Sequence, residues 1–219
     1  MLVIVILMKK KILFIGAHFD DVELGCGGTI KYFTKSNHNV KILILSNSEI
    51  KNLSDKVIVR DRNKAKQEFL NSIKILAVKK FKLLNFKTNQ IEFNDELISK
   101  IRFEIDDFKP DLIFTHWDKD AHQDHRSIGQ ATLSAGRHTS SILMYQSNNY
   151  ISEEEFNGNL FIDISKYFNH KIKSIKCYKT ELKRVKNKWI SKIKNKNLEN
   201  GNKINVKYAE NFKVIKLLY

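Results

Sequence analysis

The chain has 219 residues, of which 42% are hydrophobic, which suits one globular domain with a large core. Its two cysteines, Cys26 and Cys177, follow no paired spacing, which argues against a disulfide-stabilised scaffold and for a reducing compartment, the cytoplasm. The formal net charge is +15, and the stretch from Lys166 to Lys216 alone holds sixteen Lys or Arg and three acids. This basic stretch predicts either an anionic partner or lysines spread over solvated helix faces.

Residues 1–7 are apolar, but a run this short cannot cross a bilayer, and it lacks the charged start and the cleavage site of a secretory signal. We therefore expect residues 1–7 to be a short N-terminal extension and residues 8–219 to form a single domain without a transmembrane segment. A weak contact with a membrane surface is the alternative for the extension.

Apolar runs without alternation mark strands that are covered on both faces, beginning with Lys11–Ile15. Strands are predicted at residues 11–15, 40–45, 81–84, 112–115, 142–145 and 161–164. Helical spacing predicts helices at residues 29–35, 56–77, 97–108, 124–135 and 172–193, with a glycine turn before the first and a polar loop at 195–202 after the last. This alternation predicts an α/β fold with a Rossmann-like, doubly wound, mostly parallel sheet flanked by helices.

A histidine and two acids directly follow the first predicted strand: His18, Asp20 and Asp21. In open α/β sheets, ligands bind at the carboxyl ends of the strands. Two adjacent carboxylates beside an imidazole are unfavourable without a counter-charge, which a divalent cation supplies. One acid can then bind the metal while the other accepts a proton from water. A helix cap or a solvated turn is the alternative interpretation of the same residues.

The predicted strand at 112–115 is followed by His116 and then by His122-Gln123-Asp124-His125. His122 and His125 are three residues apart, so they share a face if this segment is helical. Asp124 can orient an imidazole or stabilise its protonated form. Imidazole and carboxylate ligands suit zinc, and a catalytic zinc site has three protein ligands and one open position. The two segments together predict one divalent metal, with zinc preferred, used for hydrolysis.

The segment from His18 to Glu23 resembles the Ala-His-Pro-Asp-Asp-x-Glu signature of the LmbE-like (PIG-L) metal-dependent N-deacetylases, with Phe19 in place of proline. The segment from His122 to His125 resembles the second signature of this family, His-x-Asp-His. Further segments are similar to the family at residues 25–29, 109–114, 141–145 and 208–212. The resemblance implies the LmbE-like version of the fold predicted above.

The resemblance also implies roles for individual residues, including three ligands to one zinc ion: His18, Asp21 and His125. Asp20 is similar to the general base of the family, which takes a proton from water activated by the metal. His122, in its charged form, corresponds to the histidine that stabilises the oxyanion and helps the amine to leave, with Asp124 as its orienting partner. Glu23 is expected to support the motif from behind.

The substrate implied by the resemblance is an N-acetylated amino sugar of the N-acetylglucosamine type in a conjugate, which the basic charge suggests is nucleotide-linked or otherwise anionic. Candidate substrate contacts, each of which could instead be structural, are Arg60, Arg137, His138 and Tyr145. The family's glutamate after the arginine and its Pro-Asp pair near Lys87-Thr88 are absent, so these contacts are less well supported than the metal ligands. A homo-oligomer is possible, and no nucleic-acid partner is expected.

Three other functions compete with this prediction. The first is an S-adenosylmethionine-dependent methyltransferase, because the glycines after Glu23 resemble the motif that binds this cofactor. These glycines, however, do not directly follow the first predicted strand, and no acid ends the second predicted strand. A basic module that binds nucleic acid would leave the histidines and acids unexplained. A deformylase, or an amidase acting on another N-acyl conjugate, would keep the same chemistry and change only the bond that is cleaved.

Overall fold

The computed structural model describes residues 9–51, 54, 57–148, 150–186 and 188–218, and the predicted extension at residues 1–7 lies outside them. The strands in this part of the chain are β1 (Lys11–Gly16), β2 (Asn39–Ser46), β3 (Ile50–Lys51), β4 (Ile58–Arg60), β5 (Lys80–Phe86), β6 (Leu112–His116), β7 (Ile142–Tyr145), β8 (Leu160–Asp163) and β9 (Ala209–Lys216). The helices are α1 (Asp21–Lys35), α2 (Arg62–Leu76), α3 (Asp95–Phe108), α4 (Gln123–Ala135), α5 (Phe168–Ile175), α6 (Lys179–Arg184) and α7 (Lys188–Asn202).

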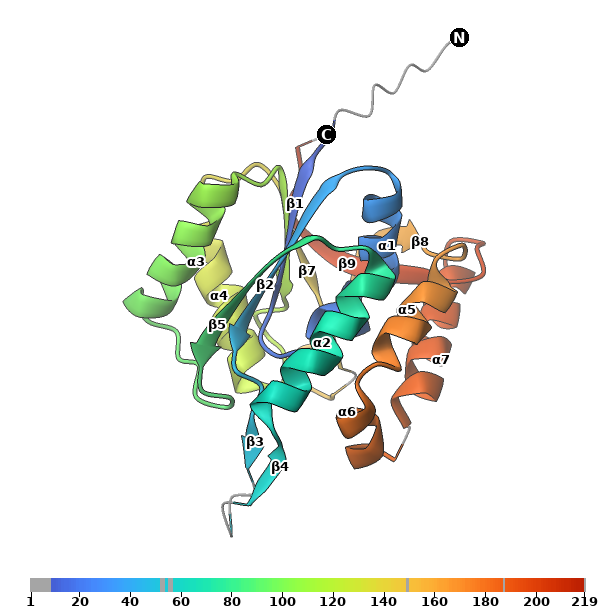
Figure 1. The fold of residues 1–219 in the computed structure, drawn as a ribbon. Helices are drawn as coiled ribbons and strands as arrows, with labels where there is room; N and C mark the ends of the chain where they lie inside the picture. The colour runs from blue at the N-terminus through green and yellow to red at the C-terminus, as the bar shows by residue number, and fades with distance from the viewer. Residues whose placement is uncertain (1–8, 52–53, 55–56, 149, 187, 219) are drawn as a thin grey trace.

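A seven-stranded sheet in the order β5-β2-β1-β6-β7-β9-β8 separates two layers of helices (Figure 1). The strands from β5 to β7 in this order run parallel to one another. β9 pairs antiparallel with β7, and β8 pairs antiparallel with β9. Alternate side chains of β1 face the two layers: Phe14 packs in the cluster with α1 and α2, and Ile15 in the cluster with α3 and α4. This arrangement confirms the predicted mostly parallel sheet flanked by helices.

The sheet places the two motifs beside each other. From β1 the chain builds outward through β2 to β5, and it then returns to pair β6 against the other side of β1. The carboxyl ends of β1 and β6 therefore meet where the strand order reverses, which is the usual place for a ligand site in this fold class. The first motif leaves β1 and the second leaves β6.

Helix α1 starts earlier than predicted, because the glycines at 25, 27 and 28 lie inside the helix rather than in a turn before it. A Cβ added to Gly25 would lie 2.3 Å from Tyr145 Cδ2, and one added to Gly28 would lie 2.7 Å from Ile164. The glycines thus allow close packing of α1 against its neighbours. Their composition suggested a turn, and only the packing shows that the helix needs residues without side chains here.

The helix predicted at 172–193 is three shorter helices, α5 to α7, and the loop predicted at 195–202 is the second half of α7. This loop prediction was wrong because two of its four asparagines, Asn197 and Asn200, are buried. Asn197 Nδ2 donates to the carbonyl of Ala209 (3.0 Å), and Asn200 Nδ2 donates to Asn211 Oδ1 (3.1 Å). Polar groups that are satisfied by β9 can be buried, although their composition is typical of a loop.

The helix predicted at 56–77 begins later, at Arg62, because the Asp61 carboxylate caps it by accepting the backbone N–H groups of Asn63 and Lys64. The residues before it form β4, which pairs with β3 in a hairpin next to the sheet edge. Cys26 is buried, Cys177 is half-buried, and both are free thiols. Within the described ranges, no helix has the length and apolar character needed to cross a bilayer.

Candidate active site

The turn between β1 and α1 carries the first motif and is tied to the end of β6. The backbone N–H of Ala17, the first residue after β1, donates to Nε2 of His116, the last residue of β6 (3.0 Å), so this hydrogen bond joins the two strand ends. Asp20 stands at the N-cap of α1 with φ 107°, a backbone conformation that non-glycine residues rarely adopt. Strain of this kind, worth roughly 1–3 kcal/mol, is typical of functional sites.

The three predicted metal ligands converge in a buried cluster, in which one potential ligand atom from each residue lies within 4.8 Å of the others. Asp21 is at its centre, with Oδ2 3.2 Å from His18 Nδ1 and Oδ1 3.4 Å from His125 Nε2. Ligand atoms around a tetrahedral zinc ion lie ~3.3 Å apart, given metal–ligand bonds of about 2.0–2.1 Å. His125 Nε2 is also buried without a hydrogen-bond partner. The cluster therefore fits a divalent ion.

Two further carboxylates contact the histidine ligands, each at the ring nitrogen that does not face Asp21. Asp124 Oδ2 lies 2.9 Å from His18 Nε2, and it is itself fixed by the backbone N–H groups of Asn89 (2.7 Å to Oδ2) and Ile91 (3.1 Å to Oδ1). Asp120 Oδ1 lies 3.2 Å from His125 Nδ1. Carboxylates in this position orient a metal-binding imidazole and select its tautomer. The side chain expected to orient His122 thus contacts His18 instead.

The metal-free cluster carries protons that a cation would displace. Burial disfavours the charged form of His18, but contacts with Asp124 and Asp21 outweigh it and raise its pKa to about 9. Burial opposes the charge on His125 as well, and Asp21 and Asp120 raise its pKa to about 10. The pKa of the Asp21 carboxyl is held well below its usual range, despite burial, by His125 and His116.

Asp20 lies beside the cluster and has a different partner. Its Oδ2 accepts a hydrogen bond from Arg60 Nη1 (3.2 Å), and the same nitrogen is 3.5 Å from the carbonyl of Phe19. Burial raises the pKa of Asp20 well above its usual range, and the charge of Arg60 opposes this shift. Adjacent acids thus titrate in opposite directions, because Asp21 is surrounded by imidazoles and Asp20 is buried beside a single guanidinium. That difference suits one ligand and one general base.

His122 completes the polar rim of the pocket. Its Nδ1 accepts the backbone N–H of Asp124 (3.2 Å) at the N-terminus of α4, so a neutral ring carries its proton on Nε2. Burial and the charges of His125 and His18 lower its pKa to about 4, which favours this neutral form over the charged form expected from the sequence. A neutral imidazole can still donate from Nε2 to a developing negative charge.

Known proteins are similar to this chain in sequence and in fold. The profile of the family described as PIG-L, GlcNAc-PI de-N-acetylase, matches residues 13–136, more than half of the chain and both motifs. The chain belongs to this family.

Two relatives and a solved structure extend the family match. The uncharacterized deacetylase YaiS of Escherichia coli is 30% identical over 181 residues, covering 78% of this chain and 92% of YaiS. A probable N-acetyl-α-D-glucosaminyl L-malate deacetylase of Bacillus subtilis is 30% identical over 135 residues, covering 58% of this chain and 61% of that protein. The structure of N,N'-diacetylchitobiose deacetylase from Pyrococcus horikoshii superposes with a TM-score of 0.82 at 21% identity and covers 94% and 84% of the two chains. The family and these relatives identify the chain as an N-deacetylase.

Of the four substrate contacts predicted for this PIG-L family member, Arg60 lines the pocket and the other three do not. Tyr145 is fully buried beneath the site, where its hydroxyl donates to the carbonyl of Ile15 (2.9 Å). Arg137 and His138 follow the C-terminus of α4, whose N-terminus is at the site, and 13 residues of helix span roughly 20 Å. Arg137 instead donates to the carbonyl of Ser134 (3.2 Å). These three residues were predicted as substrate contacts, and the fold places them in the core and at the far edge of the sheet.

Glu23 lies within the core of this PIG-L protein, on the buried face of α1. Its Oε1 accepts hydrogen bonds from Ser72 (2.8 Å) and Tyr178 (2.7 Å), so it links α1 to α2 and to the segment before α6. Burial raises the pKa of its carboxyl. It supports the helix that begins with Asp21, in keeping with the predicted supporting role.

Several residues of the site were not predicted. The orienting acid Asp120 precedes the second motif by two residues, and its place in the same short segment is the one signal that could have identified it. Glu181, Arg184 and Trp189 line the pocket from the other side, more than 50 residues farther along the chain. Nothing in their local sequence marks them, because only the return of α6 and α7 to the sheet edge brings them there.

Proposed function

We propose that the chain is a zinc-dependent N-deacetylase of an N-acetylated amino sugar conjugate of the N-acetylglucosamine type, with His18, Asp21 and His125 as ligands. One observation carries the proposal: a buried carboxylate with a raised pKa, Asp20, stands directly beside a ligand cluster of the kind that zinc prefers. A bound divalent ion would acidify a water molecule and polarise the amide carbonyl.

The chain's own residues would perform the proton transfers and stabilise charge. Asp20 would take a proton from the attacking water, and its raised pKa would let it pass that proton to the departing amine. His122 would donate a hydrogen bond from Nε2 to the oxyanion of the tetrahedral intermediate. Asp124 would keep His18 in the tautomer that presents Nδ1 to the metal. The products would be acetate and a free amine.

The names of the relatives support this substrate class. The Pyrococcus enzyme is named for N,N'-diacetylchitobiose and the Bacillus protein for an N-acetylglucosaminyl malate. The part common to both names is an N-acetylglucosamine unit, and the attached group differs. We therefore assign the acetylated sugar to the pocket formed by the two motifs. Two earlier expectations stay predictions: that the protein forms a homo-oligomer, and that it has no nucleic-acid partner.

The test combines metal analysis of the purified protein with acetate release from N-acetylglucosamine conjugates. We expect about one zinc per chain and stoichiometric release of acetate and amine. Zinc without acetate would retain the metal site and would favour a deformylase or an amidase for another N-acyl group. A protein that binds no zinc after the ion is added back would contradict the proposal.

A further inference from the structure

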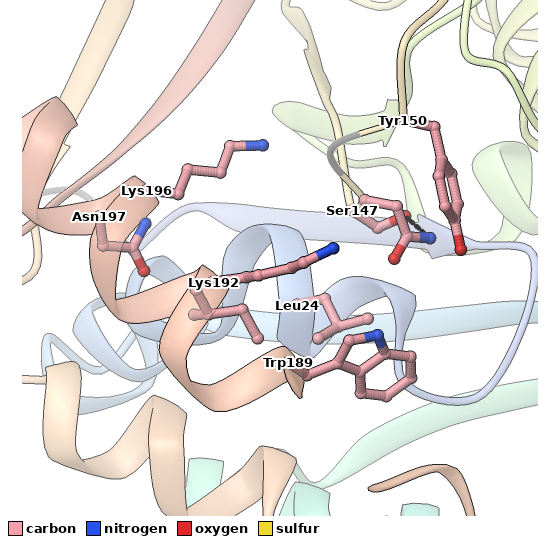
Figure 2. Close-up of a pocket in the computed structure, with 9 residues that line it drawn as sticks. Leu24, Ser147, Tyr150, Trp189, Lys192, Lys196 and Asn197 are labelled. Carbon is pink, nitrogen blue, oxygen red and sulfur yellow. Dashed lines mark hydrogen bonds between the residues drawn. The ribbon is translucent and has the colours of Figure 1, made fainter. Parts of the chain in front are cut away.

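A second pocket opens beside the candidate active site, and the two share Asn148, Tyr150 and Trp189 in their walls. This adjoining pocket has a cavity volume of about 60 Å³. Leu24, which follows the first motif on α1, contributes apolar surface to it (Figure 2). Ile193 of α7 also lines the pocket. A substrate whose acetylated sugar lies at the metal ligands would therefore extend its attached group past Trp189 into this pocket.

One face of α7 supplies the charge of the adjoining pocket. Trp189, Lys192, Ile193 and Lys196 follow each other at the spacing of a single helical face, and all four line the pocket. Figure 2 shows the side chains of Lys192 and Lys196 extending from α7 toward the segment that carries Ser147 and Tyr150. Both ammonium groups therefore lie on the side of α7 that faces this segment.

These lysines differ from the arginines of the neighbouring active site. Arg60 is paired with Asp20 at 3.2 Å, and Arg184 Nε donates to Glu181 Oε2 at 2.8 Å, so both guanidinium groups already face carboxylates. None of the described residues that line the adjoining pocket is an acid. Lys196 Nζ instead donates to two neutral acceptors, the carbonyl of Gln146 (3.3 Å) and its side-chain Oε1 (3.2 Å).

We infer that the adjoining pocket binds an anionic group, a carboxylate or a phosphate, on the part of the substrate attached to the acetylated sugar, through Lys192 and Lys196. The inference rests on the proposed function for the identity of the sugar. Trp189 and Leu24 supply the apolar surface next to the anion, and Tyr150, which is 57% exposed, borders its entrance. Burial, reinforced by Lys171 and opposed by the charges of Asp120 and Glu210, lowers the pKa of Lys196 to about 8, and an anion would favour its charged form.

The test compares three compounds on the zinc-loaded full chain: N-acetylglucosaminyl L-malate, N-acetylglucosamine 1-phosphate and neutral N,N'-diacetylchitobiose. The variants are Lys192→Gln, Lys196→Gln and the double variant. Lys194→Gln is the matched control, because Lys194 is exposed on the same helix and does not line this pocket. The readout is the ratio of kcat/KM for each anionic compound to that for the neutral one.

We expect each pocket variant to lower this ratio by about tenfold, which is typical of losing one hydrogen bond to a charged group, and the control to leave it unchanged. The malate and phosphate arms show which anion is preferred. A ratio that stays the same in the double variant would overturn the inference and leave the proposed function in place.

Binding measured by isothermal titration calorimetry with the same compounds separates the two failures. No acetate release from any compound, together with lysine-dependent binding of an anionic one, would overturn the proposed function and support the anion site. No preference for an anionic compound in either assay would overturn the anion site.

Discussion

His18 and Asp124 are 106 residues apart in the chain, and His18 Nε2 lies 2.9 Å from Asp124 Oδ2. This contact joins the turn after β1 to the first turn of α4. It leaves His18 Nδ1 facing Asp21 at 3.2 Å, so Asp124 decides which imidazole nitrogen is presented to a metal. The same carboxylate is fixed by two backbone N–H groups, which makes it a rigid support.

The Asp124→Asn substitution tests this support. An amide side chain lacks the negative charge that favours the required tautomer of His18, so we expect zinc affinity to fall by about 10- to 100-fold. Competition with a chelator of known affinity measures the effect. The control is Asp106→Asn, an exposed position on α3. Unchanged zinc affinity with lower turnover would instead assign Asp124 to His122.

The Asp20→Asn substitution separates the general base from the metal ligands. Asparagine tolerates the positive φ of this position, so the fold should be retained. We expect zinc content near that of the wild type and turnover lower by about 10²- to 10⁴-fold, because the variant has no carboxylate to accept a proton. Metal analysis and acetate release are measured on the same preparation, and turnover equal to the wild type would remove Asp20 from the mechanism.

The His125→Ala substitution removes one of the three ligands. We expect zinc to be lost during purification or dialysis, and acetate release to be lost with it. His138→Ala is the matched control, because this histidine is exposed beyond the far end of α4. If His138→Ala lowered activity as strongly as His125→Ala, the placement of residue 138 away from the substrate would be wrong.

Arg60 should control the pH at which Asp20 becomes active. Its charge favours the ionised carboxylate, so Arg60→Gln should raise the pKa of Asp20 further. Because the base works only when ionised, the acid limb of the kcat/KM profile should move to higher pH. Arg60→Lys keeps the charge and should restore the profile at least in part. A purely structural role would lower activity equally at every pH.

Removing and restoring zinc should move protons. In the metal-free protein the pKa values of His18 and His125 are about 9 and about 10, so both rings are charged at pH 7. A metal ligand must be deprotonated, and we therefore expect roughly two protons to leave as zinc binds, one from each ring. Calorimetric titration of the chelator-treated protein in buffers of different ionisation enthalpy counts them. Binding without proton release would contradict the charged state of the empty cluster.

The sequence by itself was sufficient to predict the parallel strands, the α/β class and the residues that meet in the candidate metal site. The buried part of β1, residues 12–15, is a continuous apolar run, so the local pattern was sufficient to predict a strand covered on both faces. His18, Asp20 and Asp21 lie within four consecutive residues, and the second motif is equally compact. The chemical groups of such a short motif can be recognised from a few neighbouring residues, without knowledge of the fold.

The tertiary structure alone decided which groups the motif residues contact. The partner of Asp124 is His18 rather than His122, because contacts between motifs depend on the register of β1 against β6 and on the start of α4. The positions of two predicted substrate contacts also depend on the tertiary structure. Tyr145 lies buried beneath the site, and Arg137 lies beyond the end of α4 that is farther from the site.

The substrate pocket also depends on long-range folding. Glu181, Trp189 and Lys196 reach the sheet edge only because α6 and α7 pack back against it, and the asparagines of α7 that looked like loop residues are satisfied by β9. Local composition describes the environment a residue prefers in isolation. Burial and hydrogen bonding between distant segments set the environment that it has, and those terms are fixed only when the chain has folded.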